Sequence, residues 1–129
     1  MKLKYLYVVL LSFILFSCNS QTGVQTIDAS SFSEKINETP KAQILDVRTP
    51  EEYAGGHIKN ADNVNWLGDT FSVQMEKYDR TKPVYMYCRS GKRSLAAANK
   101  LTELGFTTIY DLEGGILKWE AAGFSSEKN

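Results

Sequence analysis

The sequence predicts an α/β fold with a central, mostly parallel sheet of about five strands flanked by helices. Strand and helix candidates alternate along the chain from about residue 24 to residue 123. Residues 83–87 form a nearly continuous apolar run, which is typical of a central strand buried on both faces. The chain has 129 residues, 43% of them hydrophobic, so it suits one globular domain and excludes a disordered or coiled-coil protein.

The expected strands are short segments rich in apolar or β-branched residues, namely 24–27, 43–47, 62–66, 83–87 and 107–110. The expected helices lie between them, at 28–37, within 69–78, at 94–104 and at 116–122. Asp28 or Ser31 can cap the first of these helices. A further short helix begins at Thr49, because Thr49-Pro50-Glu51-Glu52 combines a cap, a proline at the first helical position and a glutamate three residues after the cap. Gly55 and Gly56 end it.

The helix at 94–104 shows the spacing of an amphipathic helix that packs on a sheet. Its residues expected to face inward are Leu95, Ala98, Leu101 and Leu104. Gly105 follows as a helix stop. Trp119, on the last helix, is expected to lie in the core.

The start of the chain differs from the rest. Lys2 and Lys4 precede an apolar run at 5–16, as in a secretory signal peptide. Leu15-Phe16-Ser17-Cys18 resembles the lipobox of bacterial lipoproteins, whose cysteine is lipidated and becomes the mature N-terminus. We therefore expect a signal peptide at 1–17, a tether at 18–23 and the folded domain at 24–128. This resemblance implies an exported protein anchored to a membrane of the bacterial envelope, on the periplasmic side. The alternative is an uncleaved membrane anchor, for which the apolar run is short.

Charge and cysteine content exclude several classes of protein. Lys and Arg together number 15, as do Asp and Glu, so the chain lacks the basic excess of a nucleic-acid-binding protein. One His and two Cys cannot fill a structural zinc site, and we expect neither a metal nor an organic cofactor. If Cys18 is lipidated, Cys88 is the one thiol left in the mature chain. Cys88 is then either buried and inert or functional.

Polar residues follow three of the expected strands, and Cys88 is among them. In open parallel sheets, sites form beyond the carboxyl ends of the strands. The residues placed there are Asp46 and Arg48, Cys88 and Arg89, and Asp111 and Glu113. This arrangement predicts that Cys88 lies where the fold places its chemistry.

The loop Cys88-Arg89-Ser90-Gly91-Lys92-Arg93-Ser94 joins the central strand to the following helix. Unpaired N–H groups at a helix N-terminus and three nearby cations favour the thiolate form of a cysteine. Gly91 allows a backbone conformation that turns N–H groups inward, and such a loop binds an anion. We predict that Cys88 is the nucleophile and that its loop binds the substrate through Arg89, Ser90, Gly91, Lys92, Arg93 and Ser94. The alternative is a structural cysteine followed by a solvated basic helix start.

This loop resembles the active-site loop of rhodanese-type sulfurtransferases. The segment 46–53 resembles their upstream signature, continued by Gly56-His57-Ile58, and Gly114-Gly115 with Trp119 resembles the downstream one. The resemblance spans about 27–124 and implies a single rhodanese-like domain in which Cys88 carries a persulfide. Related phosphatases of the same fold need an Arg six positions after the Cys, and Ser94 stands there. Arg93 instead closes a six-residue loop, the size associated with sulfur rather than phosphate.

Other residues near the site have structural interpretations. Asp46 is expected to support the cysteine loop through backbone hydrogen bonds without touching the substrate, and Arg48 is expected to pair with Glu52 as part of the scaffold. His57 is expected in a structural turn, although a Cys–His protease pair is conceivable from the residue types alone.

The resemblance implies an enzyme that moves sulfane sulfur from a donor such as thiosulfate to a thiol or cyanide, through a persulfide on Cys88. A protein could also serve as the sulfur acceptor. The first alternative is a non-catalytic persulfide carrier or binding module, which needs the same reactive cysteine. The second is phosphatase or arsenate reductase chemistry on the same fold.

Overall fold

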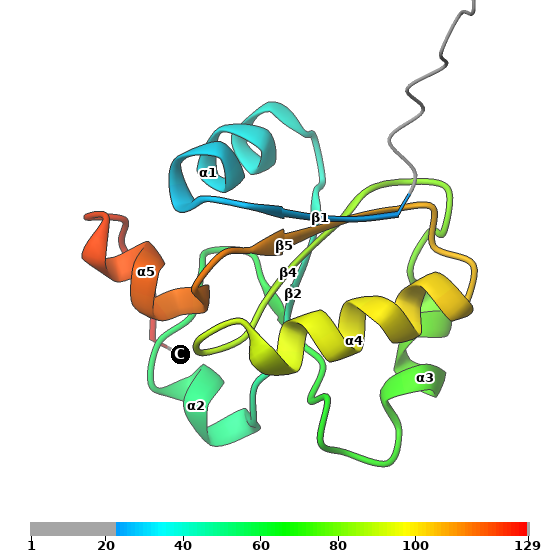
Figure 1. The fold of residues 1–129 in the computed structure, drawn as a ribbon. Helices are drawn as coiled ribbons and strands as arrows, with labels where there is room; N and C mark the ends of the chain where they lie inside the picture. Colours follow the sequence, from blue (N-terminus) through cyan, green and yellow to red (C-terminus); the bar gives the residue numbers. More distant parts are fainter. Residues whose placement is uncertain (1–22, 129) are drawn as a thin grey trace, which may run out of the picture.

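A computed structural model describes residues 23–128 of the chain (Figure 1). The predicted signal peptide at 1–17 and Cys18, with nearly all of the tether at 18–23, therefore lie outside the described residues. No helix within 23–128 is long and apolar enough to span a lipid bilayer. The described part is one α/β unit with a single sheet at its centre.

The sheet has five parallel strands in the order β1-β5-β4-β2-β3. The strands are β1 (Gly23–Ile27), β2 (Gln43–Asp46), β3 (Asp62–Asn63), β4 (Val84–Tyr87) and β5 (Thr108–Leu112). Parallel pairing requires a crossover between neighbours, and helices supply most of these connections. The helices are α1 (Ala29–Glu38), α2 (Pro50–Ala54), α3 (Phe71–Gln74), α4 (Lys92–Glu103) and α5 (Gly115–Ala121), and a 3₁₀ turn, η1 (Met75–Lys77), follows α3. The predicted α/β class and parallel sheet are confirmed.

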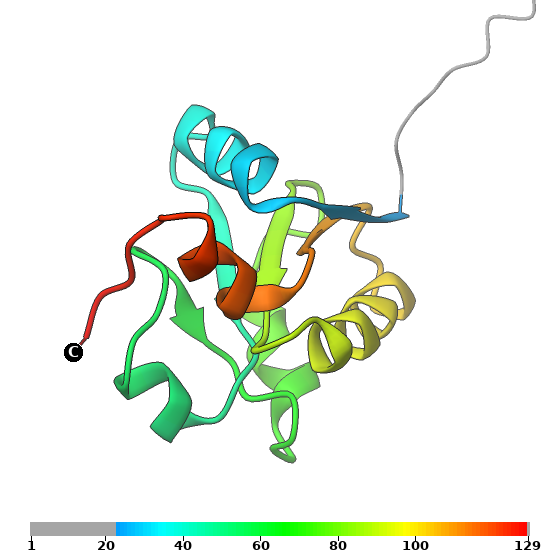
Figure 2. The ribbon, with the colours of Figure 1, turned by 60° about the vertical axis from the view of Figure 1, so that its left-hand side comes forward.

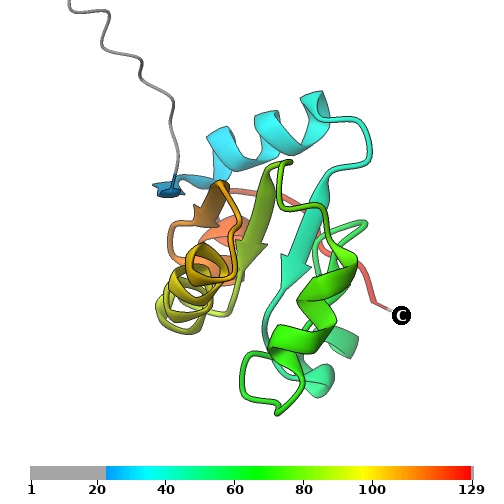
Figure 3. The same cartoon turned by 90° about the vertical axis from the view of Figure 1, so that its right-hand side faces the viewer.

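Helices cover both faces of the sheet. Figure 1 shows α1 on one side of the strands and α4 on the other, and Figures 2 and 3 show the same layers from two further directions. Side chains alternate along a strand, so β4 contributes to both cores. Val84 and Met86 pack toward α4, whereas Tyr85 and Tyr87 pack toward α1 and α5. This explains the continuous apolar run that predicted a central strand.

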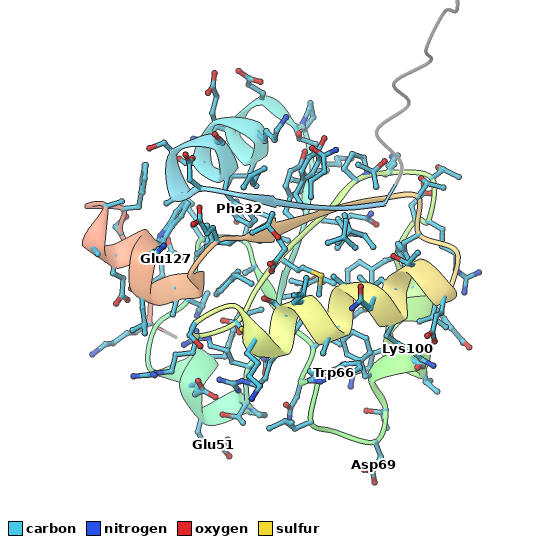
Figure 4. The ribbon with its side chains drawn as sticks, in the orientation of Figure 1. Phe32, Glu51, Trp66, Asp69, Lys100 and Glu127 are labelled. Carbon is cyan, nitrogen blue, oxygen red and sulfur yellow. The ribbon has the colours of Figure 1, made fainter. Side chains whose placement is uncertain are left out.

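Aromatic residues anchor the two layers. In the layer beneath α1, Phe32 contacts Tyr85 and Trp119 edge-to-face, with ring centroids about 6 Å apart. In the opposite layer, Trp66 contacts Phe71 at 5.0 Å, also edge-to-face. Figure 4 labels Phe32 and Trp66, which lie on opposite sides of the sheet. The expected core position of Trp119 is confirmed, since it is 5% exposed.

Three predicted elements differ from the structure. The strand expected at 62–66 has only two paired residues, and the helix expected within 69–78 is one α-helical turn followed by η1. The helix expected at 94–104 begins two residues earlier, at Lys92, so its first turn contains the cations of the cysteine loop. Leu95, expected to face inward, is 46% exposed. The residues that pack inward from α4 are Ser94, Ala97, Ala98 and Leu101.

Candidate active site

Cys88 lies at the carboxyl end of the central strand, in the loop that joins β4 to α4 (Figure 1). Its side chain is buried, and the backbone N–H of Gly91 points at Sγ with an N–S distance of 3.1 Å. Gly91 caps α4 with φ +108°, a value that disfavours any residue with a side chain. The Ser94 hydroxyl lies 3.4 Å from Sγ on the other side. The expected thiol at a helix N-terminus is therefore present in the structure.

The first turn of α5 holds the cysteine loop in place. Ile116 N–H donates to the carbonyl of Cys88 at 3.0 Å, and Leu117 N–H donates to the carbonyl of Arg89 at 3.2 Å. This close approach requires Gly115, whose φ is +61°. A Cβ on Gly115 would stand 2.5 Å from the Cys88 carbonyl oxygen and would also overlap the Arg89 carbonyl oxygen. The paired glycines of the sequence motif thus allow two backbone segments to pack together.

Arg93 does not face an open anion site in this structure, because Glu52 binds it. The two terminal nitrogens of Arg93 donate to the two carboxylate oxygens of Glu52, at 2.7 and 3.0 Å. The hydrogen bond from Arg93 lowers the pKa of Glu52 to about 2, so the pair stays ionised over a wide pH range. Glu52 in turn raises the pKa of Arg93, and the charge of a Cys88 thiolate adds to that rise. Arg93 is therefore held beside the cysteine loop by α2.

The predicted capping box of α2 explains how Glu52 reaches this place. The Thr49 hydroxyl accepts from Glu52 N–H at 3.3 Å, and the Glu52 carboxylate accepts from Thr49 N–H at 3.4 Å. Pro50 opens the helix, as expected from the sequence. One carboxylate thus caps α2 and binds Arg93 from the active-site loop.

The expected pairing of Arg48 with Glu52 is wrong. Arg48 folds back onto Asp46, with its terminal nitrogen 2.6 Å from a carboxylate oxygen, and it also donates to the carbonyl of Gly56 at 2.6 Å. The Asp46 carboxylate accepts from the Arg48 backbone N–H as well, at 3.0 Å. The hydrogen bonds of the Arg48 side chain lie in the turn after β2 and at the end of α2. Asp46 is linked to the strand that ends at Cys88 in two ways: Val47 N–H donates to the carbonyl of Tyr87, and the Asp46 carboxylate acts on the Tyr87 hydroxyl, whose pKa it helps to raise.

The remaining predicted loop residues differ in their exposure. Arg89, Ser90 and Lys92 are exposed to solvent, whereas Ser94 is fully buried next to Cys88. The two exposed cations carry no ion pair among the described residues. They can meet an incoming anion at the surface, while the backbone N–H groups bind it deeper in the loop.

His57 lies in a structural turn. It is buried, its Nδ1 is 3.0 Å from the carbonyl oxygen of Tyr53, and its ring stacks on the Tyr53 ring at 3.8 Å. Its backbone pairs with Glu127 near the end of the described chain, which is labelled in Figure 4. These contacts agree with the structural interpretation rather than with a Cys–His pair. Within 23–128, no cluster of His, Cys, Asp or Glu is arranged to hold a metal ion.

Sequence reasoning noted Asp111 at a strand end but gave it no role. The structure buries it to 3% exposure on β5, with Thr26 donating to one carboxylate oxygen at 3.4 Å. The other oxygen, Oδ1, is buried without a hydrogen-bond partner. Burial raises the pKa of Asp111, and the hydroxyls of Ser94 and Thr26 oppose that rise. The signal available in the sequence was an Asp within an otherwise apolar strand.

Asp111 gives a prediction for stability against pH. Because its pKa is higher in the folded than in the unfolded protein, its favourable contribution is complete below about pH 3.8 and is lost as pH rises through the folded pKa. We expect Asp111→Asn to raise the free energy of unfolding at pH 7 by on the order of 1 kcal/mol, the scale of a poorly satisfied buried polar group. Urea denaturation should show the gain shrinking toward pH 3. The exposed Asp69→Asn is the control, and an equal gain in both variants would contradict this account.

Comparison with known proteins agrees with this geometry. The model of the rhodanese-like domain family matches residues 28–122. The chain is 33% identical over 100 residues to a sulfurtransferase of Allochromatium vinosum, covering 78% of this chain and 92% of that protein. It is 37% identical over 86 residues to the thiosulfate sulfurtransferase GlpE of Coxiella burnetii, covering 67% of this chain and 78% of that one.

A solved structure gives the same result. The crystal structure of a rhodanese-related protein from Thermoplasma volcanium matches with a TM-score of 0.71 and 31% identity, covering 81% of this chain and 99% of that one. The family match includes the cysteine loop, the capping box of α2 and the paired glycines before α5. The chain therefore belongs to the rhodanese-like domain family and is homologous to sulfurtransferases.

Proposed function

We propose that this protein is a sulfurtransferase that moves sulfane sulfur from a small anionic donor such as thiosulfate to a thiophilic acceptor, through a persulfide on Cys88. The observation that carries this proposal is the position of Sγ at the N-terminus of α4. There the Gly91 N–H points at it from 3.1 Å, and the same loop carries two exposed cations, Arg89 and Lys92. Such an arrangement stabilises a negative sulfur in both the thiolate and the persulfide state. The relatives named sulfurtransferases support it further.

The reaction needs only this one nucleophile. The Cys88 thiolate attacks the outer sulfur of thiosulfate, a new S–S bond forms, the donor's S–S bond breaks, and sulfite leaves with the electron pair. A thiol or cyanide then attacks the outer sulfur of the persulfide, and the Cys88 thiolate leaves. Backbone N–H groups of the cysteine loop stabilise the charge throughout. No step requires a metal or an organic cofactor.

The environment of Arg93 favours sulfur transfer over phosphate chemistry. A phosphatase needs an arginine that is free to bind two oxygens of the phosphate. Here both terminal nitrogens of Arg93 are engaged by Glu52, and buried Ser94 occupies the position that the phosphatase loop gives to arginine.

The direct test is the production of thiocyanate from thiosulfate and cyanide. We expect many thiocyanate molecules per protein molecule, and no hydrolysis of a chromogenic phosphate ester. A single equivalent of thiocyanate would instead indicate a stoichiometric persulfide carrier. Phosphate release without thiocyanate would contradict sulfur transfer.

Arg93→Ala is expected to raise the KM for thiosulfate about tenfold, which corresponds to roughly 1.4 kcal/mol. The change removes a positive charge that attracts dianionic thiosulfate. It also leaves the negative charge of Glu52 unpaired beside the loop, and this charge repels thiosulfate. The double variant Glu52→Gln/Arg93→Ala restores the charge balance and should recover part of the loss. Lys92→Ala, at an exposed cation, should change the KM much less.

Steady-state kinetics at low and high salt check this prediction. The effect of Arg93→Ala should shrink near 1 M salt, where exposed charges are screened within ~3 Å. Equal KM values for Lys92→Ala and Arg93→Ala would show that only diffuse charge acts on the donor. In that case Arg93 has no special place in donor binding.

We further propose that Cys18 carries the lipid anchor that attaches the protein to a membrane of the bacterial envelope, facing the periplasm. The lipobox-like segment ending at Cys18 supports this proposal. Cys18→Ala should move the protein from the membrane fraction to the soluble fraction and block lipoprotein processing. Unchanged fractionation would instead favour an uncleaved apolar anchor.

A further inference from the structure

Arg93 is the cation of the cysteine loop that the fold holds in one place. It lies in the first turn of α4, two residues after Gly91, whose backbone N–H points at the Cys88 sulfur. A thiolate at Cys88 lies close enough for its charge to raise the pKa of Arg93. Arg89 and Lys92 are exposed instead, and neither takes part in the ion pairs of the described part of the chain. Arg93 is therefore the loop cation best placed to hold an anion beside the nucleophile.

The Glu52 carboxylate already occupies the guanidinium group of Arg93. The two terminal nitrogens of Arg93 donate to the two carboxylate oxygens, at 2.7 and 3.0 Å. A guanidinium group makes the same two-point contact with two oxygens of a sulfate or phosphate ion. Glu52 thus takes the place that an oxyanion from solution would take on Arg93.

The fold holds Glu52 in this place but does not bury the pair. Its carboxylate also accepts hydrogen bonds from the backbone N–H and the hydroxyl of Thr49, at 3.4 and 3.2 Å. The side chains of Arg93 and Glu52 are 24% and 28% exposed, so an anion from solvent can reach them. Such an anion must displace a carboxylate that belongs to the same chain and therefore competes at a high effective concentration.

The neighbouring ion pair offers no substitute for Arg93. Arg48 lies close enough for its charge to lower the pKa of Arg93. Its own guanidinium group binds Asp46 at 2.6 Å and also donates to the carbonyl of Gly56 at 2.6 Å. The affinity of the loop for an oxyanion therefore depends on whether Glu52 holds Arg93 or releases it.

We propose that Glu52 is a specificity-determining residue of this site, whose carboxylate competes with dissolved oxyanions for Arg93 and keeps sulfate and phosphate out of the cysteine loop. No covalent bond forms or breaks in this role. Glu52 acts through Arg93 and is a positioning residue, not a catalytic one.

The meaning of this competition for turnover rests on the proposed sulfurtransferase function. Thiosulfate and sulfate are both tetrahedral dianions, so a free arginine would bind both of them. Tighter binding that the two anions share adds no selectivity between them. A loop whose arginine is held by Glu52 binds both weakly, and only thiosulfate has a sulfur that can pass to Cys88. The donor is then selected by the reactivity of its sulfur and not by its charge.

The test is the protection of Cys88 from iodoacetamide by inorganic sulfate, with chloride keeping the ionic strength constant. Alkylation is measured by mass spectrometry on the Cys88 peptide of the full chain. We expect Glu52→Gln to lower the sulfate concentration that halves the alkylation rate by about tenfold relative to wild type, because Arg93 is freed. Glutamine also fits a capping box, so α2 should be kept. In steady-state kinetics, the KM for thiosulfate should fall while kcat changes little.

Glu51→Gln is the matched control. It removes the same charge from the adjacent residue of α2, which is exposed and labelled in Figure 4, and the ion pairs within 23–128 do not include it. Its protection by sulfate should equal that of wild type. The double variant Glu52→Gln/Arg93→Ala should lose the gain of Glu52→Gln. Unchanged protection in Glu52→Gln, or equal gains in Glu51→Gln and Glu52→Gln, would overturn the proposal.

A second variant covers the case in which Glu52→Gln does not fold. Glu52→Asp keeps the charge but has a shorter side chain, so its carboxylate should hold Arg93 less well and protection by sulfate should again increase. No increase in that variant would overturn the proposal. Alkylation needs no sulfur donor. A failure to produce thiocyanate with the sulfate shift intact would therefore count against the proposed function and not against the role of Glu52.

Discussion

Cys88→Ser is expected to lower thiosulfate turnover by more than about 10³-fold. A serine hydroxyl stays protonated near neutral pH, so it is a weak nucleophile, and it cannot form a persulfide. Serine is nearly isosteric with cysteine, so it fits the buried position of Cys88, which is 1% exposed. The backbone N–H of Gly91 can donate to the serine hydroxyl as it does to Sγ. The fold should therefore be kept, with an unchanged circular dichroism spectrum. The loss should appear in kcat and not only in KM.

The chain contains a matched control in its other cysteine. Cys18→Ser makes the same chemical change outside the described domain and should keep turnover when assayed in detergent extracts. Residual turnover of Cys88→Ser above a few per cent of wild type would mean that another group carries the sulfur. Equal losses in both variants would point to instability rather than to chemistry.

Gly115→Ala is expected to lower turnover about 100-fold and the free energy of unfolding by roughly 2–4 kcal/mol. The new Cβ would overlap the carbonyl oxygens of Cys88 and Arg89, which are backbone atoms and cannot rotate away. The cysteine loop must then move relative to α5, breaking the hydrogen bonds to Ile116 and Leu117. A shift of about 1 Å in a reacting group commonly costs 10²-fold in rate.

Substitutions of two further glycines distinguish the steric clash at Gly115 from the backbone strain that any side chain suffers at a positive φ. Gly123 has φ +89° with open space around its Cβ position, so Gly123→Ala measures the left-handed strain alone. Gly114 has φ +71°, and its added Cβ would overlap Cγ and Cδ of Lys118, so this side chain must change rotamer while the backbone of the cysteine loop is not touched. Both controls should lose about 1 kcal/mol in the free energy of unfolding and little turnover. A Gly115→Ala variant that behaves like Gly123→Ala would contradict the close packing of α5 on the cysteine loop.

The elements that depend on local spacing were predictable from the sequence. The cap at Thr49, the central strand and the glycine turn before α4 all follow from residues close together in the chain. The start of α4 was placed too late, because cations at its first turn resemble loop residues. The inward face of α4 was also misassigned, because polar Ser94 was not expected to be buried. Ser94 lies on the same face as Ala97, Ala98 and Leu101, so Leu95 faces solvent.

Interactions between distant segments could not be predicted in the same way. The partner of Glu52 is Arg93, 41 residues away, and no periodicity indicates that pairing. Arg48 was expected to reach forward along the chain, but its side chain folds back to Asp46 because the turn after β2 brings the two within 2.6 Å. The position of Asp111 beside Met86 depends on the strand order, since β5 lies beside β4 although α4 separates them in sequence.

The measurement that tests the central claim most directly is the mass of the Cys88 peptide after incubation with thiosulfate. The account predicts an increase of about 32 Da, the mass of one sulfur atom, on Cys88 alone. Cyanide should then remove this increase and release one equivalent of thiocyanate. Two results would contradict a persulfide on Cys88 as the sulfur carrier. One is turnover of thiosulfate with Cys88 unmodified at every time point. The other is the extra sulfur on a different residue.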